Sequence, residues 1–223
     1  MSATIDSSTV VQYLTDHPRF FEEHAALLGK FKLSSPLTGR TVSLQERQME
    51  VMREKHRGLE LRMAELTRLA KENAAIVDKF HGWTLALLQV RQAADLPRAM
   101  IDTLQARFCV PQATLRLWNV APDHLQSWFA QDVSSDARLF ANSLRTPYCG
   151  SNHDFEAVRW LNASDTIEST VIVPLRAAGE NGETFGLLIL GSPDPQRFTA
   201  DMALDFLVQI GETASAALGA LKA

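Results

Sequence analysis

The longest stretch without a helix breaker runs from Ser43 to about Val90, and it limits what the chain can fold into. It contains no proline and no turn cluster, and only Gly58 and Gly82 interrupt good helix formers. Its first residues, "SLQE" at 43–46, fit a capping box, which satisfies free backbone amides at a helix start. The pattern therefore predicts one long helix over this stretch.

Apolar residues repeat along this predicted helix with the spacing of a coiled coil. With Leu59 at heptad position a, the d positions on either side of it hold Lys55 and Arg62, so the seam begins polar and becomes apolar from Leu66 onward. The predicted dimer seam consists of Leu59, Leu66, Leu69, Asn73, Ile76, Phe80, Trp83 and Leu87.

Length indicates that this seam needs a partner. About 45 residues at ~1.5 Å each give roughly 65–70 Å, whereas a domain of the remaining ~130 residues is roughly 35–40 Å across. Each large apolar side chain left in water forgoes roughly 1.5–3 kcal/mol. Asn73 favours a parallel, in-register homodimer, because symmetry then places a second amide opposite it. The alternative is an antiparallel hairpin within one chain, with Asn73 facing solvent.

Residues 1–42 predict a helical appendage. One short helix begins near Asp6, and Pro18 opens a second. That second helix carries an apolar face, which consists of Phe20, Phe21, His24, Leu27 and Leu28. So short a segment rarely folds alone, so this face is expected to dock on the start of the long helix, in the same chain or in its dimer mate. A DNA-binding helix-turn-helix is the alternative, but the segment has only four Lys or Arg residues.

Residues 91–223 predict an α+β domain. A helix is expected to begin at Leu96, and a final helix closes the chain. The expected strands are 113–120, 125–130, 168–177 and 184–192, the first two forming a meander and the last two an antiparallel hairpin. Their apolar runs imply a sheet covered on both faces. Helices cover one face, and the connection 132–165 is expected to cover the other, where a pocket can form.

This C-terminal pattern resembles a GAF domain, the sensor fold close to PAS, most clearly in the closing hairpin and helix "GLLILGSPDPQRFTADMALDFLVQI". The whole chain is similar to DUF484, a family of bacterial proteins. The matching stretches are "YLTDHPRFFEEHAALL", "VSLQERQMEVMREK", "LRLW", "PYCG" and "VIVPL". The resemblance implies an antiparallel GAF/PAS-like sheet flanked by helices, behind a coiled-coil helix (43–90) and the appendage. It implies no activity, ligand or cofactor.

Charge and motif content narrow the functional classes. Residues 91–223 hold ten basic and fifteen acidic side chains, which argues against nucleic-acid binding. The sequence has neither a secretory signal nor a membrane span, and its two cysteines are far apart, so a cytoplasmic protein with reduced thiols is expected. No metal-spaced histidine pattern, P-loop or nucleophile motif occurs, which predicts a protein that is not an enzyme.

The candidate pocket residues are Arg116, Trp118, Trp128, Tyr148 and Cys149. Arg116 and Trp118 share one face of a predicted strand. An arginine beside a tryptophan there either forms a structural ion pair with a carboxylate or binds an anionic group of a ligand. The favoured hypothesis is a sensor module, dimeric through its long helix, whose N-terminal helices meet a protein partner. Two alternatives stay open: a ligand-free interaction scaffold, and a redox sensor or enzyme that uses Cys149 as its thiol.

Overall fold

The structure is a computed structural model, and it describes residues 6–28, 30, 32–34, 41–131, 133–177, 182–200 and 204–223. The chain divides into two compact units, Met1–Glu72 and Asn73–Ala223. Each unit is described separately below, with helix α4 contributing to both.

The first unit begins with three short helices, α1 (Ser7–Asp16), α2 (Phe20–Glu23) and α3 (Ala25–Leu28). Strand β1 (Lys32–Ser34) then pairs antiparallel with β2 (Thr41–Ser43), a pairing that the sequence did not predict.

The predicted Phe20–Phe21 pair packs within this appendage. The ring centroid of Phe20 lies 5.3 Å from that of Phe21, 4.7 Å from that of His24 and 5.9 Å from that of Tyr13 on α1. Phe20 therefore contacts the first helix, and Phe21 contacts Phe20. Their expected docking on the long helix stays a prediction.

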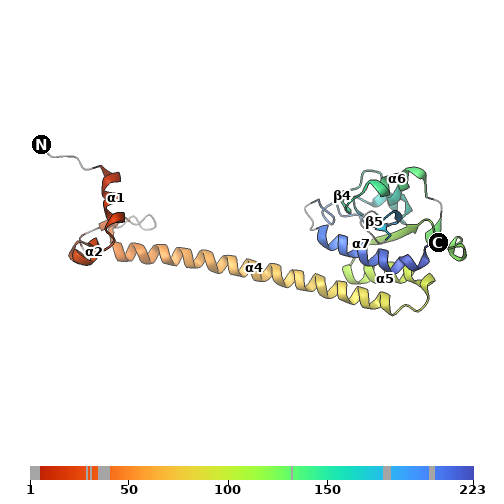
Figure 1. Cartoon of the computed structure of the whole chain (residues 1–223), viewed down its shortest axis with the longest axis horizontal. Helices are drawn as coiled ribbons and strands as arrows, with labels where there is room; N and C mark the ends of the chain where they lie inside the picture. The colour runs from red at the N-terminus through yellow and green to blue at the C-terminus, as the bar shows by residue number, and fades with distance from the viewer. Residues whose placement is uncertain are drawn as a thin grey trace. The chain divides into compact units, whose positions relative to one another are not determined.

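Helix α4 spans Leu44–Leu88, 45 residues, and begins directly after the predicted capping residue Ser43 (Figure 1). The absence of proline and turn residues predicted this element nearly to its ends. Ion pairs along its exposed surface, such as Arg68 with Glu65 and Glu72, give it local support.

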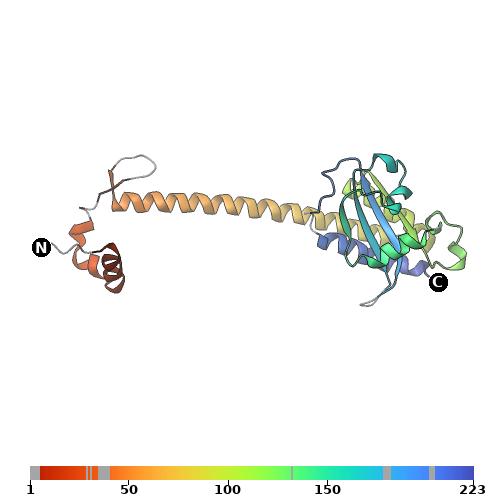
Figure 2. The ribbon, with the colours of Figure 1, turned by 90° about the horizontal axis from the view of Figure 1, so that it is seen from above.

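The second unit contains a four-stranded antiparallel sheet in the order β3-β6-β5-β4. Its strands are β3 (Gln112–Leu117), β4 (Tyr148–Ser151), β5 (Ser169–Arg176) and β6 (Thr184–Ser192), which lie side by side in Figure 2. The β5–β6 hairpin confirms the antiparallel pairing predicted for 168–177 and 184–192. The α+β fold class is thereby confirmed.

The strand and meander predicted at 125–130 are wrong. A 3-10 helix, Trp128–Ala130, lies in this segment, and another, Pro122–His124, directly precedes it. Its amides are satisfied locally, for example by Ser127 N donating to His124 O at 3.0 Å, so they cannot join a sheet ladder. The fourth strand is β4 instead, which lies in the predicted 132–165 connection and pairs with β5.

Helices cover both faces of the sheet, as predicted. On one face lie α5 (Leu96–Phe108), α7 (Leu204–Leu218) and the end of α4, with the short helices Ala93–Asp95 and Gly219–Leu221. On the other lie α6 (Ser135–Ser143) and the 3-10 helices Glu156–Trp160 and Ser164–Thr166, from the 132–165 connection and its edge (Figure 1). Each face therefore has its own apolar core.

The end of α4 belongs to this domain's core, which corrects part of the predicted dimer seam. Trp83 and Leu87 are 0% and 4% exposed within the single chain, and Phe80 packs against the same cluster. The indole N–H of Trp83 donates to Met100 O on α5 at 3.2 Å. Because their own domain covers Trp83 and Leu87, these two residues cannot be the seam that a second chain covers.

Candidate functional site

Trp118 is part of the structural core. It is 6% exposed, and its indole N–H donates to Thr184 O at 2.7 Å on the neighbouring strand β6. The Arg138 guanidinium from α6 lies 5.9 Å from its ring centroid. Its indole N–H has a partner and its ring lies among apolar neighbours, so Trp118 helps to pack the sheet against α6 and the 132–165 connection.

Tyr148 and Cys149 are also engaged inside the fold. The Tyr148 hydroxyl donates to Ser151 O at 2.7 Å, and burial raises the pKa of this phenol. The Cys149 sulfur lies 3.2 Å from Thr199 O, and burial raises the pKa of the thiol. A thiol with a raised pKa holds less thiolate at neutral pH, so Cys149 lacks the activation that a nucleophilic cysteine needs.

Arg116 and Trp128 line one cavity of about 340 Å³ at the β3 edge of the sheet. The Arg116 guanidinium lies 5.2 Å from the ring centroid of Trp160, a cation–π geometry. Trp128 is 40% exposed. The structure thus brings together two of the five predicted pocket residues and adds Trp160. That residue was missed because its helix is a single turn inside a polar connection.

Amide side chains complete this β3-edge cavity, which Gln105, Gln112, Gln131 and Asn162 also line. Among the described residues, the Gln112 side-chain oxygen is buried without a hydrogen-bond partner. Indole faces, amides and a guanidinium together suit a small planar molecule with polar edges.

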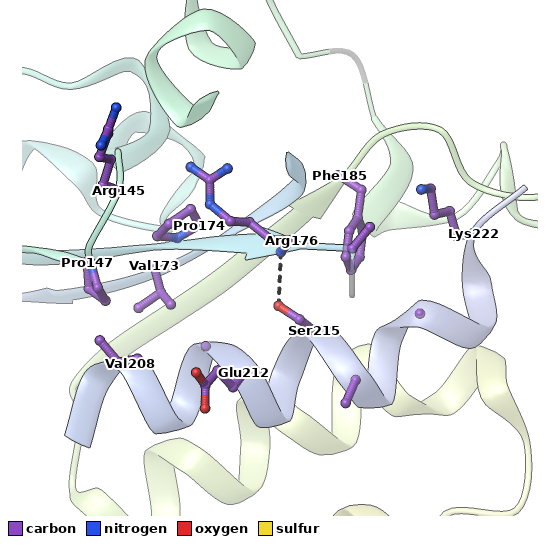
Figure 3. A pocket seen from close by; sticks show the side chains of 14 residues that line it. Arg145, Pro147, Val173, Pro174, Arg176, Phe185, Val208, Glu212, Ser215 and Lys222 are labelled. Atoms are coloured by element: carbon purple, nitrogen blue, oxygen red, sulfur yellow. Dashed lines mark hydrogen bonds between the residues drawn. The ribbon is translucent and has the colours of Figure 1, made fainter. Parts of the chain in front are cut away.

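A second cavity, of about 580 Å³, lies between β5 and α7 (Figure 3). Val173 and Phe185 give it apolar walls, and Glu212 and Ser215 on α7 line it from the other side. Arg145, Arg176 and Lys222 line it too. With three cations and one carboxylate, its charge is positive. No sequence pattern pointed to this cavity, because its residues come from four separate segments.

Arg176 already has structural partners in that cavity. Its guanidinium donates to the carbonyls of Leu144 at 2.5 Å, Gly182 at 3.2 Å and Asn142 at 3.3 Å. Its backbone amide donates to the Ser215 hydroxyl at 3.0 Å (Figure 3). Arg176 therefore joins the end of α6 to β5 and α7, and its donors serve the fold.

The described ranges hold no group of three or more His, Cys, Asp or Glu side chains that could bind a metal ion. Nor, over those same residues, is any helix both long and apolar enough to span a membrane.

One face of α4 carries a row of apolar side chains that are exposed in the single chain. Met49, Met52, Leu59, Met63 and Leu66 are between 53% and 64% exposed. Single exposed apolar residues are common on proteins, but a stripe along one helix face marks an interaction surface.

Solved structures similar to this chain are GAF domains. One is from a protein described as a sensor histidine kinase of Pseudomonas syringae pv. tomato (15% identity, 69% of this chain, 91% of that chain, TM-score 0.44). Another is from an Acinetobacter phosphoenolpyruvate-protein phosphotransferase (14%, 65%, 93%, 0.46), and a third from the Coxiella burnetii phosphoenolpyruvate-protein phosphotransferase (8%, 66%, 94%, 0.47). At these identities no activity is transferred to this chain.

No curated protein matches the chain. The family model described as "Protein of unknown function, DUF484" matches residues 1–219, which is nearly the whole sequence. The chain belongs to the DUF484 family.

Proposed function

We propose that this protein is a non-enzymatic, GAF-like regulatory and interaction module that forms a homodimer through α4. The exposed apolar surface of that helix carries the proposal. Covering one large apolar side chain is worth roughly 1.5–3 kcal/mol, so the five residues of this surface favour association strongly. A second copy of the same helix is the partner that is present wherever the protein is.

Asn73 supports a parallel arrangement. Its side chain is exposed in the single chain. In a parallel, in-register pair the two Asn73 amides face each other and can exchange hydrogen bonds, whereas most other registers leave the amide against apolar side chains. A polar residue at such a position specifies register and oligomeric state at a cost in stability.

The N-terminal helices are the proposed contact with a protein partner. Val10, Val11 and Tyr13 on α1 are exposed, and no residue of α1 or α2 is buried. Dimerisation would present two copies of this surface together and raise the avidity for a partner that is itself dimeric. We place the protein in the cytoplasm, where its two free cysteines, Cys109 and Cys149, would stay reduced.

Substitution of one seam residue tests the proposal. Leu66→Glu puts like charges opposite each other in the dimer, and at least tenfold weaker association, about 1.4 kcal/mol or more, is expected by light scattering. Leu61→Glu is the matched control, because Leu61 is 66% exposed but lies on another face of α4. Equal association of the two variants and the unmodified chain would contradict the proposal.

Ligand binding is the second candidate function, and the β3-edge cavity with Arg116, Trp128 and Trp160 favours it. A bound small molecule there would act as the signal that the dimer transmits. Native mass spectrometry of the purified protein tests this: a retained mass that Arg116→Ala loses supports a ligand, and a bare chain in both supports a ligand-free scaffold. The third candidate, thiol chemistry at Cys149, is disfavoured by the raised thiol pKa.

A further inference from the structure

Two apolar stripes on α4 can serve as the dimer seam, and they share Met52, Leu59 and Leu66. In the register predicted from sequence, the core positions that alternate with these shared residues are Lys55, Arg62 and Leu69. In the alternative register they are His56, Met63 and Ala70. Both choices keep the alternating three- and four-residue spacing of a coiled coil, so spacing cannot decide between them.

Burial inside the single chain separates the two stripes. Residues seven apart lie on nearly the same face of a helix, so the column that contains Leu69 continues through Ile76 to Trp83. Trp83 is covered by its own domain. The column that contains Met63 and Ala70 continues instead to Val77, which is 61% exposed. The second column is therefore the more open of the two, because Leu69 and Ile76 of the first column are only 42% and 40% exposed.

The charges at the core positions also distinguish the two registers. In a parallel dimer each core residue faces its own copy, so the first register places Lys55 against Lys55 and Arg62 against Arg62. Like charges that meet in a desolvated seam are costly. The second register replaces these two layers with His56 and Met63, and it places Met49 in the seam where the first register has Gln48.

The second register also creates an attractive pair between the chains. Lys55 becomes a g residue and Glu60 the e residue five positions later, the pairing that flanks the core of a parallel coiled coil. Within one chain Glu60 lies 3.3 Å from His56, so its carboxylate already points along this side of α4. In the first register the residues flanking the apolar part of the seam form no oppositely charged g–e pair.

We infer that the parallel dimer seam of this protein runs through Met49, Met52, His56, Leu59, Met63, Leu66 and Ala70, with a second copy of the chain as the occupant. This inference rests on the proposed dimer and specifies which face of α4 forms it. Leu69 and Ile76 then flank the seam, and Trp83 and Leu87 remain in the domain core. His56 is the one titratable core residue of this segment.

Site-specific disulfide formation tests this seam in the full chain. Single cysteines are introduced in a Cys109→Ser background, which removes the exposed native thiol. Met63→Cys and Arg62→Cys form one matched pair of neighbours, and His56→Cys and Lys55→Cys form a second. A disulfide requires Cβ atoms about 3.5–4.5 Å apart, so mild oxidation should cross-link the Met63 and His56 variants at least about tenfold faster than their neighbours.

The possible outcomes distinguish a wrong seam from a wrong dimer. Faster cross-linking at Arg62 and Lys55 would overturn the inferred seam and keep a parallel dimer. No cross-link at any of the four sites in a protein that sediments as a dimer would overturn parallel, in-register pairing through this segment. No cross-link in a protein that sediments as a single chain would overturn both the seam and the proposed function.

Discussion

Replacement of Trp83 by alanine tests whether the end of α4 is a structural part of the C-terminal domain. Trp83 is fully buried among residues of α5, α7 and the sheet. A buried tryptophan removes about 150–250 Å² from water, which is worth about 4–6 kcal/mol at ~25 cal/mol per Å². Alanine retains a small part of this, and Trp→Ala changes in cores cost about 3–5 kcal/mol. We therefore expect Trp83→Ala to lower the free energy of unfolding by about 3–5 kcal/mol.

Two control variants are needed to interpret this measurement. Trp83→Phe keeps most of the ring but loses the bond to Met100 O, so a smaller loss is expected, about 1 kcal/mol for the hydrogen bond plus a small packing term. Leu88→Ala alters a residue of the same helix that is 76% exposed, and its effect should stay within about 0.5 kcal/mol.

Urea unfolding followed by far-ultraviolet circular dichroism measures all three variants. The protein concentration must be fixed, because association shifts the midpoint by mass action. If Trp83→Ala costs no more than Leu88→Ala, the end of α4 does not belong to the domain core. The assignment of Trp83 outside the dimer seam would then be wrong.

Three further predictions concern single residues. Cys149 should react with iodoacetamide much more slowly than exposed Cys109 at neutral pH, and its rate should rise only as the pH approaches the raised pKa of its thiol. Mass spectrometry of each site measures the two rates, and equal rates would refute the burial argument. Arg176→Gln should lose about 1.5–3 kcal/mol of stability, because it breaks charged hydrogen bonds to the end of α6, whereas exposed Arg145→Gln should be nearly neutral. Asn73→Leu should stabilise the dimer and admit other oligomeric states, and an unchanged mass distribution by light scattering would remove Asn73 from the seam.

The sequence was most informative where one local signal extends over many residues. Forty-five residues without a breaker predicted α4, and two continuous apolar runs around a glycine-containing turn predicted β5 and β6. Short elements were missed. Strand β4 has four residues and exists because it pairs with β5, a partner far along the chain. The segment 125–130 contains strand-forming residues, but local turns take its amides.

The candidate site was likewise predicted only in part. Alternation along β3 correctly placed Arg116 and Trp118 on one face of the sheet. Which of the two meets solvent depends on what covers that face. Packing of α6 and the connection buries Trp118, whereas Arg116 lies at the edge beside Trp160. In the same way, the heptad pattern included Trp83, because nothing in the sequence indicates that the domain's own core covers this residue.

The association state of the full chain tests the central claim most directly. Sedimentation equilibrium at micromolar concentration is expected to give twice the 24.7 kDa mass of the chain, with a dissociation constant that Leu66→Glu raises. A single species of 24.7 kDa across the concentration range would contradict the account, because the exposed stripe of α4 would then stay uncovered in solution.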